Sequence, residues 1–227
     1  MIREFQEFFE TLYNRWRWPL HTIRKSYNIT QDNQIKRIDD KTISEKKKKK
    51  KIKILVRDAN VTGLAVTIFN NSEVAYQKAF GYSNIETKDS LEINHIFDGA
   101  SLSKSVFAYL VAKLVSEKKI DLDRPIYSYF DVELPDIAID KEFRRLNDLN
   151  DDERYRQFTI RMCLSHTTGL PNWRWINNPD EKLRIQFNPG TNYSYSGEGI
   201  MLAQWLVEHK TKKNLEDLAK EKVFKPL

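Results

Sequence analysis

The distribution of glycine constrains this chain more than any other feature. All seven glycines of the 227 residues lie at or after Gly63. Glycine marks turns whose backbone angles other residues avoid, so this asymmetry favours a folded domain that begins near residue 52. We therefore predict two regions of different character, an N-terminal region of residues 1–53 and a folded domain of residues 54–227.

The N-terminal region carries the positive charge of the chain. Residues 1–53 hold 15 basic and 7 acidic side chains, a net charge of +8, whereas the whole chain sums to +6 and the remainder therefore to −2. Lys46 to Lys51 form an unbroken run of six lysines. Such a run is typical of a solvated, disordered linker. It lacks the interleaved aromatic side chains that stack on bases, so we expect no specific nucleic-acid partner.

The first residues predict an amphipathic helix that docks or packs against another element. Residues 2–18 place apolar side chains at helical spacing, and Pro19 ends the pattern. The N-terminus lacks the apolar core of a signal peptide, and no apolar run is long enough to span a membrane. The single cysteine, Cys163, excludes an internal disulfide. These features leave the localisation open.

The later region predicts strands first and helices afterwards, which indicates an α+β fold. Strands are expected at residues 52–55, 64–69 and 73–80, and the last two form a hairpin around the turn pair Asn70-Asn71. Apolar residues recur at spacings of three and four from Ser101 to about Lys118, so a long helix is expected there. Further helices are expected at residues 159–165, 197–209 and 215–223, with a loop-rich stretch at 120–157.

The pattern Ser-x-x-Lys places a nucleophile one helical turn before a group that handles its proton. It occurs three times, at Ser44, Ser101 and Ser116. The first copy lies in the lysine run and the third at the charged end of a helix. Only Ser101, with Lys104, opens a long apolar helix directly after a turn. By itself the pattern also fits a serine that caps a helix, with an ordinary surface lysine one turn later.

Four segments give Ser101 its context, and together they resemble the family of class C β-lactamases, D-alanyl-D-alanine carboxypeptidases and related esterases. The first segment consists of Val61–Phe69, Phe80-Gly81-Tyr82 and Ile96–Lys104. The second, Leu164–Pro171, is similar to the family's LLSHTSGLP, and the third, Phe187–Gly197, is similar to F-x-P-G-x-x-F-x-Y-S-N. The fourth, Val223–Leu227, is similar to the start of the family's PLGM stretch. Their order matches the family's order, which makes a chance resemblance improbable.

The resemblance implies a β-lactamase/DD-peptidase-like fold, an antiparallel sheet flanked by helices with a helical subdomain. It implies a serine hydrolase that forms an acyl-enzyme on a small ester, amide or peptidoglycan-like substrate, without a metal or a cofactor. Ser101 would be the nucleophile, with Lys104 and Tyr195 as its proton-handling partners. Members of the family are often periplasmic or attached to the cell envelope.

The resemblance places the family's Tyr-x-Asn motif at Tyr195-Ser196-Gly197. Two other tyrosines compete for this assignment, and one residue departs from the family pattern. Tyr82-Ser83-Asn84 matches Tyr-x-Asn literally, but it precedes Ser101 and is interpreted as turn chemistry. Tyr193 competes locally, and the offset from the Pro-Gly pair favours Tyr195. Gly197 stands where the family has an asparagine whose amide orients amide substrates, so esters become the better candidates. Gly197 and Trp173 are the predicted substrate-binding residues, with aromatic packing as the alternative role of Trp173.

Two further expectations follow from the resemblance. No Lys-Thr-Gly or His-x-Gly motif lies between residues 198 and 227, so we predict a C-terminally truncated domain whose last strands are missing. An inactive remnant or a ligand-binding module of the same fold is therefore the alternative to an active hydrolase. His166 is predicted to order a loop by bonding backbone groups, because no carboxylate stands at metal-ligand spacing from it.

Overall fold

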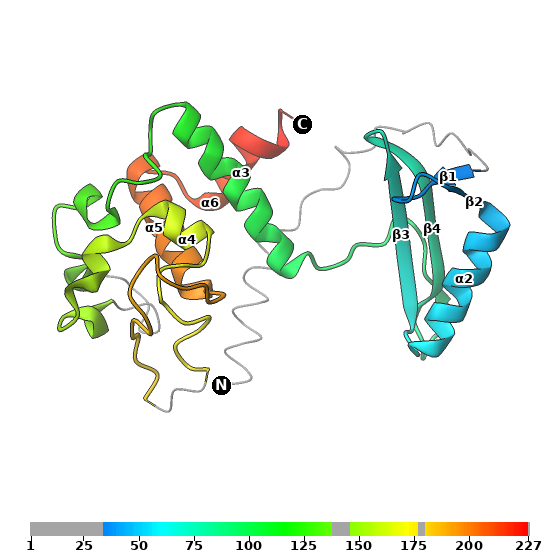
Figure 1. Cartoon of the computed structure of the whole chain (residues 1–227), viewed down its shortest axis with the longest axis horizontal. Coiled ribbons are helices and arrows are strands. Elements are labelled where there is room, and N and C mark those ends of the chain that lie inside the picture. Colours follow the sequence, from blue (N-terminus) through cyan, green and yellow to red (C-terminus); the bar gives the residue numbers. More distant parts are fainter. Residues whose placement is uncertain (1–33, 138–145, 177–179, 227) are drawn as a thin grey trace. The chain divides into compact units, whose positions relative to one another are not determined.

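The computed structural model describes residues 34–137, 146–176 and 180–226, which belong to two compact units (Figure 1). One unit ends at Asp98 and the other begins at Gly99. The helix predicted at residues 2–18 lies outside the described residues. Within them, no helix combines the length and the apolar character that are needed to cross a bilayer.

The first unit contains the predicted β-hairpin. β3 (Gly63–Asn70) and β4 (Glu73–Asn84) pair antiparallel in a register that runs from Gly63 opposite Gly81 to Asn70 opposite Glu73. Asn71 and Ser72 close the hairpin with φ values of 51° and 63°, the backbone that lets a two-residue turn follow the twist of the strands. The short β5 (Asp89–Ser90) adds to β4 as a third strand.

The lysine run is helical, which corrects two predictions. α2 (Glu45–Asp58) includes all six lysines and the segment 52–55 that was predicted to be a strand. Lysine is a good helix former, and the Oγ of Ser44 caps the helix by accepting the backbone N–H of Lys47 at 3.4 Å. Lys48 is buried with its Nζ 3.1 Å from the centre of the Tyr76 ring on β4, so the run is not uniformly solvated.

The segment before α2 is also ordered, where a linker was predicted. β1 (Gln34–Lys36) and β2 (Thr42–Ser44) form a small antiparallel hairpin that leads into α2. α2 itself runs across the domain boundary predicted between residues 53 and 54, and that boundary stays a prediction.

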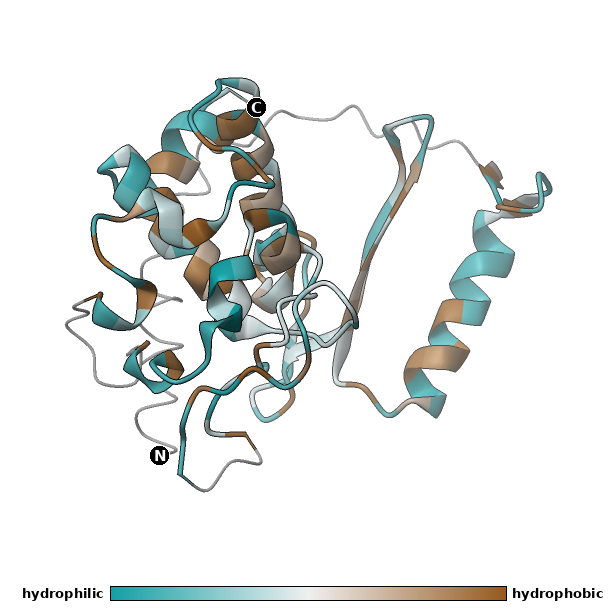
Figure 2. Ribbon diagram, turned by 60° about the vertical axis from the view of Figure 1, so that its left-hand side comes forward, coloured by the Kyte–Doolittle hydropathy of each residue, from teal (hydrophilic) through white to brown (hydrophobic). Residues whose placement is uncertain are grey.

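The second unit is a helical body, as the sequence pattern predicts. It is built from α3 (Ser103–Ser116), α4 (Ile160–Leu164), α5 (Gly197–Thr211) and α6 (Leu215–Ala219), which continues as a wider turn over Lys220–Phe224. The apolar faces of these helices meet in one core. Figure 2 marks the hydrophobic segments of each helix in brown. Its most deeply buried members include Val111, Leu114, Phe158, Ile160, Ala203 and Leu206. This core fixes the start of α3 relative to the start of α5, where the candidate site lies.

Candidate active site

Ser101 lies in a tight turn that leads directly into α3. The turn spans Ala100–Leu102, and one helical turn later Lys104 donates a hydrogen bond from Nζ to the Oγ of Ser101 at 3.2 Å. Ala100, immediately before the serine, has a φ of 39°, a backbone region that is costly for a residue with a Cβ. Backbone strain of this kind persists only where the surrounding structure holds it, and such residues are concentrated at functional sites.

Tyr195 meets Ser101 although 94 residues separate them in the sequence. The phenol oxygen of Tyr195 donates to the Oγ of Ser101 at 2.8 Å. The Nζ of Lys104 lies 5.1 Å from the centre of the same tyrosine ring. The structure thus brings together all three residues predicted to carry the chemistry, on the surface of the second unit.

The backbone on both sides of Tyr195 is anchored to His166. The N–H of Ser194 donates to the carbonyl oxygen of His166 at 2.9 Å, and the N–H of Ser196 donates to its Nδ1 at 3.1 Å. Ser196, which is fully buried, then caps α5 by accepting the N–H of Gly199 at its Oγ, at 2.8 Å. The position of the tyrosine is therefore fixed by bonds immediately before and after it.

The C-terminal end of α4 positions His166. Its φ is 58°, and the N–H groups of His166 and Thr167 close the helix onto the carbonyls of Cys163 and Met162 at 3.3 and 2.9 Å. This is a Schellman end, with histidine in the left-handed position that glycine usually takes. The ring centre then lies 4.6 Å from that of Tyr195. The prediction that His166 orders a loop by bonding backbone groups is confirmed.

The electrostatics of the cluster favour a neutral histidine and a more acidic tyrosine. Burial, with the nearby charge of Lys104, lowers the pKa of His166 below its usual value, although the Ser196 hydrogen bond opposes this. Burial alone would raise the pKa of Tyr195, but hydrogen bonds with Lys104 and Ser101 and the charge of Lys104 outweigh it, so the pKa lies below its usual value. The phenolate form of Tyr195, which can accept a proton, is thereby more populated at a given pH than that of an ordinary tyrosine.

The competing motifs have other roles in the structure. The Oγ of Ser44 caps α2, and the Oγ of Ser116 donates to the carbonyl of Lys113 at 2.8 Å. Asn84 accepts the N–H groups of the two residues that follow Ile85, at 2.9 and 3.3 Å, which confirms that Tyr82-Ser83-Asn84 is turn chemistry. The hydrogen bond to Ser101 comes from Tyr195 and not from Tyr193.

Gly197 is required by the backbone of the neighbouring loop and by the ring of Trp173. A Cβ at position 197 would lie 2.6 Å from the carbonyl oxygen of Asn172 and 2.8 Å from two carbons of the Trp173 indole. Asn172 also accepts the N–H groups of Gly197 and Glu198 at its carbonyl, at 3.0 and 3.1 Å. The indole therefore occupies the space into which a side chain at position 197 would extend.

Gly197→Ala is accordingly expected to lower the free energy of unfolding by about 1–3 kcal/mol, because the close carbonyl oxygen is backbone and cannot turn away. The measurement is the midpoint of thermal or urea unfolding. Gly99→Ala is the matched control, since a Cβ at Gly99 meets no atom within 4 Å. Equal midpoints for the two variants would contradict the packing described around Gly197.

Sequence reasoning missed the buried ion pair that holds this loop on α5. Arg174 donates from its backbone N and its Nε to the Oε1 of Glu198, both at 3.0 Å, and from Nη2 to Oε2 at 2.8 Å. Asp148 lies 3.6 Å from the Nη1 of the same arginine. The side chains of Arg174 and Glu198 are only 3% and 4% exposed. The one sequence signal was a carboxylate in the first turn of α5, where the helix dipole favours it.

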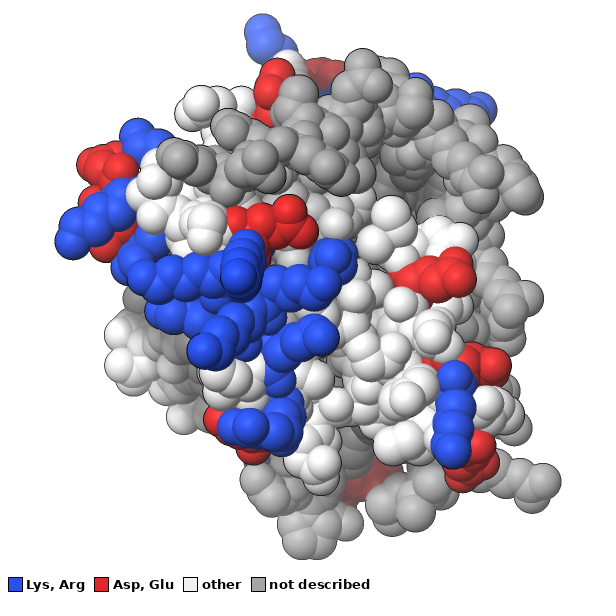
Figure 3. Space-filling model, turned by 90° about the vertical axis from the view of Figure 1, so that its right-hand side faces the viewer, with Lys and Arg blue, Asp and Glu red and all other residues white. Residues whose placement is uncertain are grey.

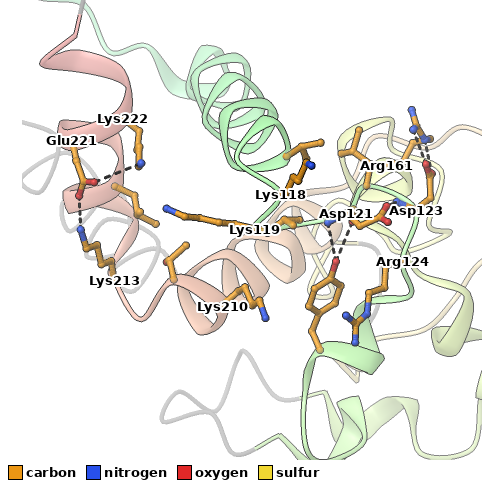
Figure 4. A pocket seen from close by; sticks show the side chains of 16 residues that line it. Lys118, Lys119, Asp121, Asp123, Arg124, Arg161, Lys210, Lys213, Glu221 and Lys222 are labelled. Atoms are coloured by element: carbon orange, nitrogen blue, oxygen red, sulfur yellow. Dashed lines mark hydrogen bonds and ion pairs between the residues drawn. The ribbon is translucent and has the colours of Figure 1, made fainter.

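Each unit also carries a basic surface. A groove of about 810 Å³ lies at the C-terminal end of α3, the opposite end from Ser101, where Asp123 pairs with Arg161 and Glu221 with Lys213 (Figure 4). In the first unit, one face of α2 gathers its cations into a continuous patch (Figure 3). That face consists of Lys46, Lys49, Lys50, Lys53 and Arg57. Across the described ranges, no group of histidine, cysteine and carboxylate side chains is suited to hold a metal ion.

Comparison with known proteins identifies the family of the chain. Residues 40–227 match the family model described as Beta-lactamase. The chain belongs to the beta-lactamase family. Penicillin-binding protein 4* of Bacillus subtilis is 28% identical in an alignment of 172 positions that covers 68% of this chain and 34% of that protein. An uncharacterized protein of Alkalihalophilus pseudofirmus is 28% identical over 167 residues, 73% of this chain and 42% of that one.

The solved structures show the same fold. The octameric penicillin-binding protein homologue from Pyrococcus abyssi superposes with a TM-score of 0.61 at 22% identity, over 78% of this chain and 42% of that chain. The β-lactamase/DD-peptidase fold predicted from the sequence is thus confirmed. This beta-lactamase family member spans less than half the length of the relatives that it matches. The predicted truncation stays a prediction.

Proposed function

We propose that this beta-lactamase family chain is a serine hydrolase that transfers the acyl group of a small ester to Ser101 and then to water. The observation that supports the proposal best is the convergence of two partners on one hydroxyl, with Tyr195 at 2.8 Å and Lys104 at 3.2 Å from the Oγ of Ser101. A nucleophile within hydrogen-bond reach of an oriented base is the arrangement that acyl transfer needs.

The proposed roles follow from the charges and the contacts. Tyr195, with its lowered pKa, accepts the proton of Ser101 as the Oγ attacks the carbonyl carbon, and returns it to the leaving oxygen. Lys104 stabilises the phenolate form by its charge. His166 keeps the tyrosine in place through the backbone at Ser194 and Ser196. In the second step Tyr195 accepts a proton from the attacking water and returns it to the Oγ of Ser101 as that oxygen leaves the acyl group.

An ester is favoured over an amide or a peptidoglycan-like substrate because of Gly197. The carbonyl of Asn172 and the indole of Trp173 leave no room for a side chain at this position. Position 197 itself therefore supplies no carboxamide to orient the N–H and C=O of an amide substrate, and the Oδ1 of the neighbouring Asn172 is engaged by the N–H of Gly197 at 3.2 Å. Esters, which have a better leaving group and no N–H to satisfy, need no such partner.

Tyr195→Phe is expected to lower kcat/KM for p-nitrophenyl acetate by about 10²–10⁴-fold, because general acid–base catalysis contributes about that much. The wild-type rate should rise with pH and level off below about pH 10, the ordinary tyrosine pKa, because the phenolate is the active form. Tyr193→Phe is the matched control and should retain both the rate and the pH profile. The measurement is steady-state hydrolysis across pH.

Equal rates for the Tyr195→Phe and Tyr193→Phe variants would overturn the assignment of the base. Absence of hydrolysis and of covalent labelling in the wild-type chain would favour a ligand-binding module of the same fold.

A further inference from the structure

Two tryptophans form an aromatic wall next to Gly197, at the start of the helix that follows Tyr195. The rings of Trp173 and Trp175 are stacked with their centres 5.2 Å apart and their planes 6° from parallel. The edge of Trp173 lies against Gly197, two residues after Tyr195. Both indoles are half-buried, and Ile176 in the same turn is 45% exposed. We use the name aromatic wall for the stacked rings of Trp173 and Trp175.

The polar groups behind this wall are bonded within the chain. The N–H groups of Gly197 and Glu198 donate to the carbonyl of Asn172, and that of Gly199 donates to the Oγ of Ser196. The carboxylate of Glu198 is bound by Arg174. The first turn of α5 thus has its backbone donors and its acid occupied, so a ligand that lies here meets aromatic carbon rather than hydrogen-bonding groups.

The wall is also rigid. The buried ion pair ties the backbone N–H and the guanidinium of Arg174 to Glu198 on α5, and Trp173 and Trp175 flank that arginine in the sequence. The indoles are therefore held in place before any ligand arrives, and little entropy is lost when a flat group stacks on them.

We propose that the aromatic wall selects substrates whose acyl group carries a phenyl ring or a similarly flat apolar group. This selectivity rests on the proposed function, because it assigns an acyl preference to the Ser101 site. A short acyl group such as acetyl would leave the indoles uncovered and gain nothing from them. A phenylacetyl group would stack on them and release the water that they hold.

The test measures binding without turnover, so that it stands apart from the proposed chemistry. The full chain with Ser101→Ala is titrated with methyl phenylacetate and with methyl acetate, and the NMR signals of the indole N–H groups report binding. We expect the phenylacetyl ester to bind on the order of tenfold more tightly, the preference that aromatic stacking supplies. Trp173→Leu in the same background should abolish the difference, because leucine preserves an apolar side chain but not the stack.

Trp175→Leu removes the other ring of the stack, away from the Gly197 contact, and should reduce the preference even where Trp173→Leu disturbs folding. Tyr193→Phe is the control and should keep it. Equal affinity of the parent for the two esters, or a preference that survives both tryptophan substitutions, would overturn the proposal. Failure of Ser101 to be acylated would instead appear in the hydrolysis assay and would leave this binding result unaffected.

Discussion

Ser101→Ala is expected to abolish ester hydrolysis, with a fall in kcat on the order of 10⁶-fold, the loss that removal of the nucleophile causes in a serine hydrolase. The Oγ of Ser101 is the atom on which Tyr195 and Lys104 converge, and no other described hydroxyl has both of these partners. Without it, the remaining groups have no acceptor for the acyl group. The same substitution should remove covalent labelling by a fluorophosphonate probe, read on a gel.

Ser116→Ala is the matched control for this prediction. Ser116 starts the Ser-x-x-Lys copy at the other end of α3, but its Oγ donates to the carbonyl of Lys113 and Lys119 pairs with Glu117 at 2.8 Å. Within the described part of the chain no base is hydrogen-bonded to its hydroxyl, so the variant should hydrolyse and label like the wild type. Equal loss of label in both variants would show that the probe does not report on Ser101.

Arg174→Met is expected to lower the free energy of unfolding by about 3–5 kcal/mol, the cost of leaving one member of a buried ion pair without its partner. Glu198 would lose its hydrogen bonds from the guanidinium, and the nearby Asp148 would lose its counter-charge. Both carboxylates are at most 9% exposed, so water cannot replace the arginine. Chemical unfolding followed by fluorescence measures the change.

The control for this second prediction is Arg161→Met. Arg161 makes an equally well-formed pair with Asp123, at 2.6 and 2.8 Å, but the two side chains are 59% and 63% exposed. Exposed pairs contribute about 0–1 kcal/mol because water already screens them. A loss for Arg174→Met as small as that for Arg161→Met would contradict the structural importance of the buried pair.

The sequence predicts correctly those helices and strands whose local pattern agrees with their tertiary contacts. The hairpin of β3 and β4 and the helix α3 follow from alternation and from helical periodicity, and the structure has both. α2 was missed because a run of lysines suggests a solvated linker by composition alone. Besides the helix propensity of lysine and the Ser44 cap, α2 has a contact that no local pattern shows, the burial of Lys48 against the ring of Tyr76 on β4.

The sequence predicts the reactive residues of the candidate site but not the residues that hold the neighbouring loop in place. Ser101, Lys104 and Tyr195 were identified from motif order, and the structure brings their side chains together. The ion pair of Arg174 and Glu198 joins residues 24 positions apart, and neither stands in a pattern that points to the other. The role of Gly197 likewise depends on where the loop at Asn172 and Trp173 packs, which only the three-dimensional structure determines.

The most direct measurement of the central claim is peptide mapping by mass spectrometry after the full chain reacts with a fluorophosphonate. We predict one added group per chain, carried by the Oγ of Ser101, and a labelling rate that falls in the Tyr195→Phe variant. A label on Ser103, Ser116 or another residue, or no added mass on the folded wild-type chain, would contradict the assignment of Ser101 as the nucleophile.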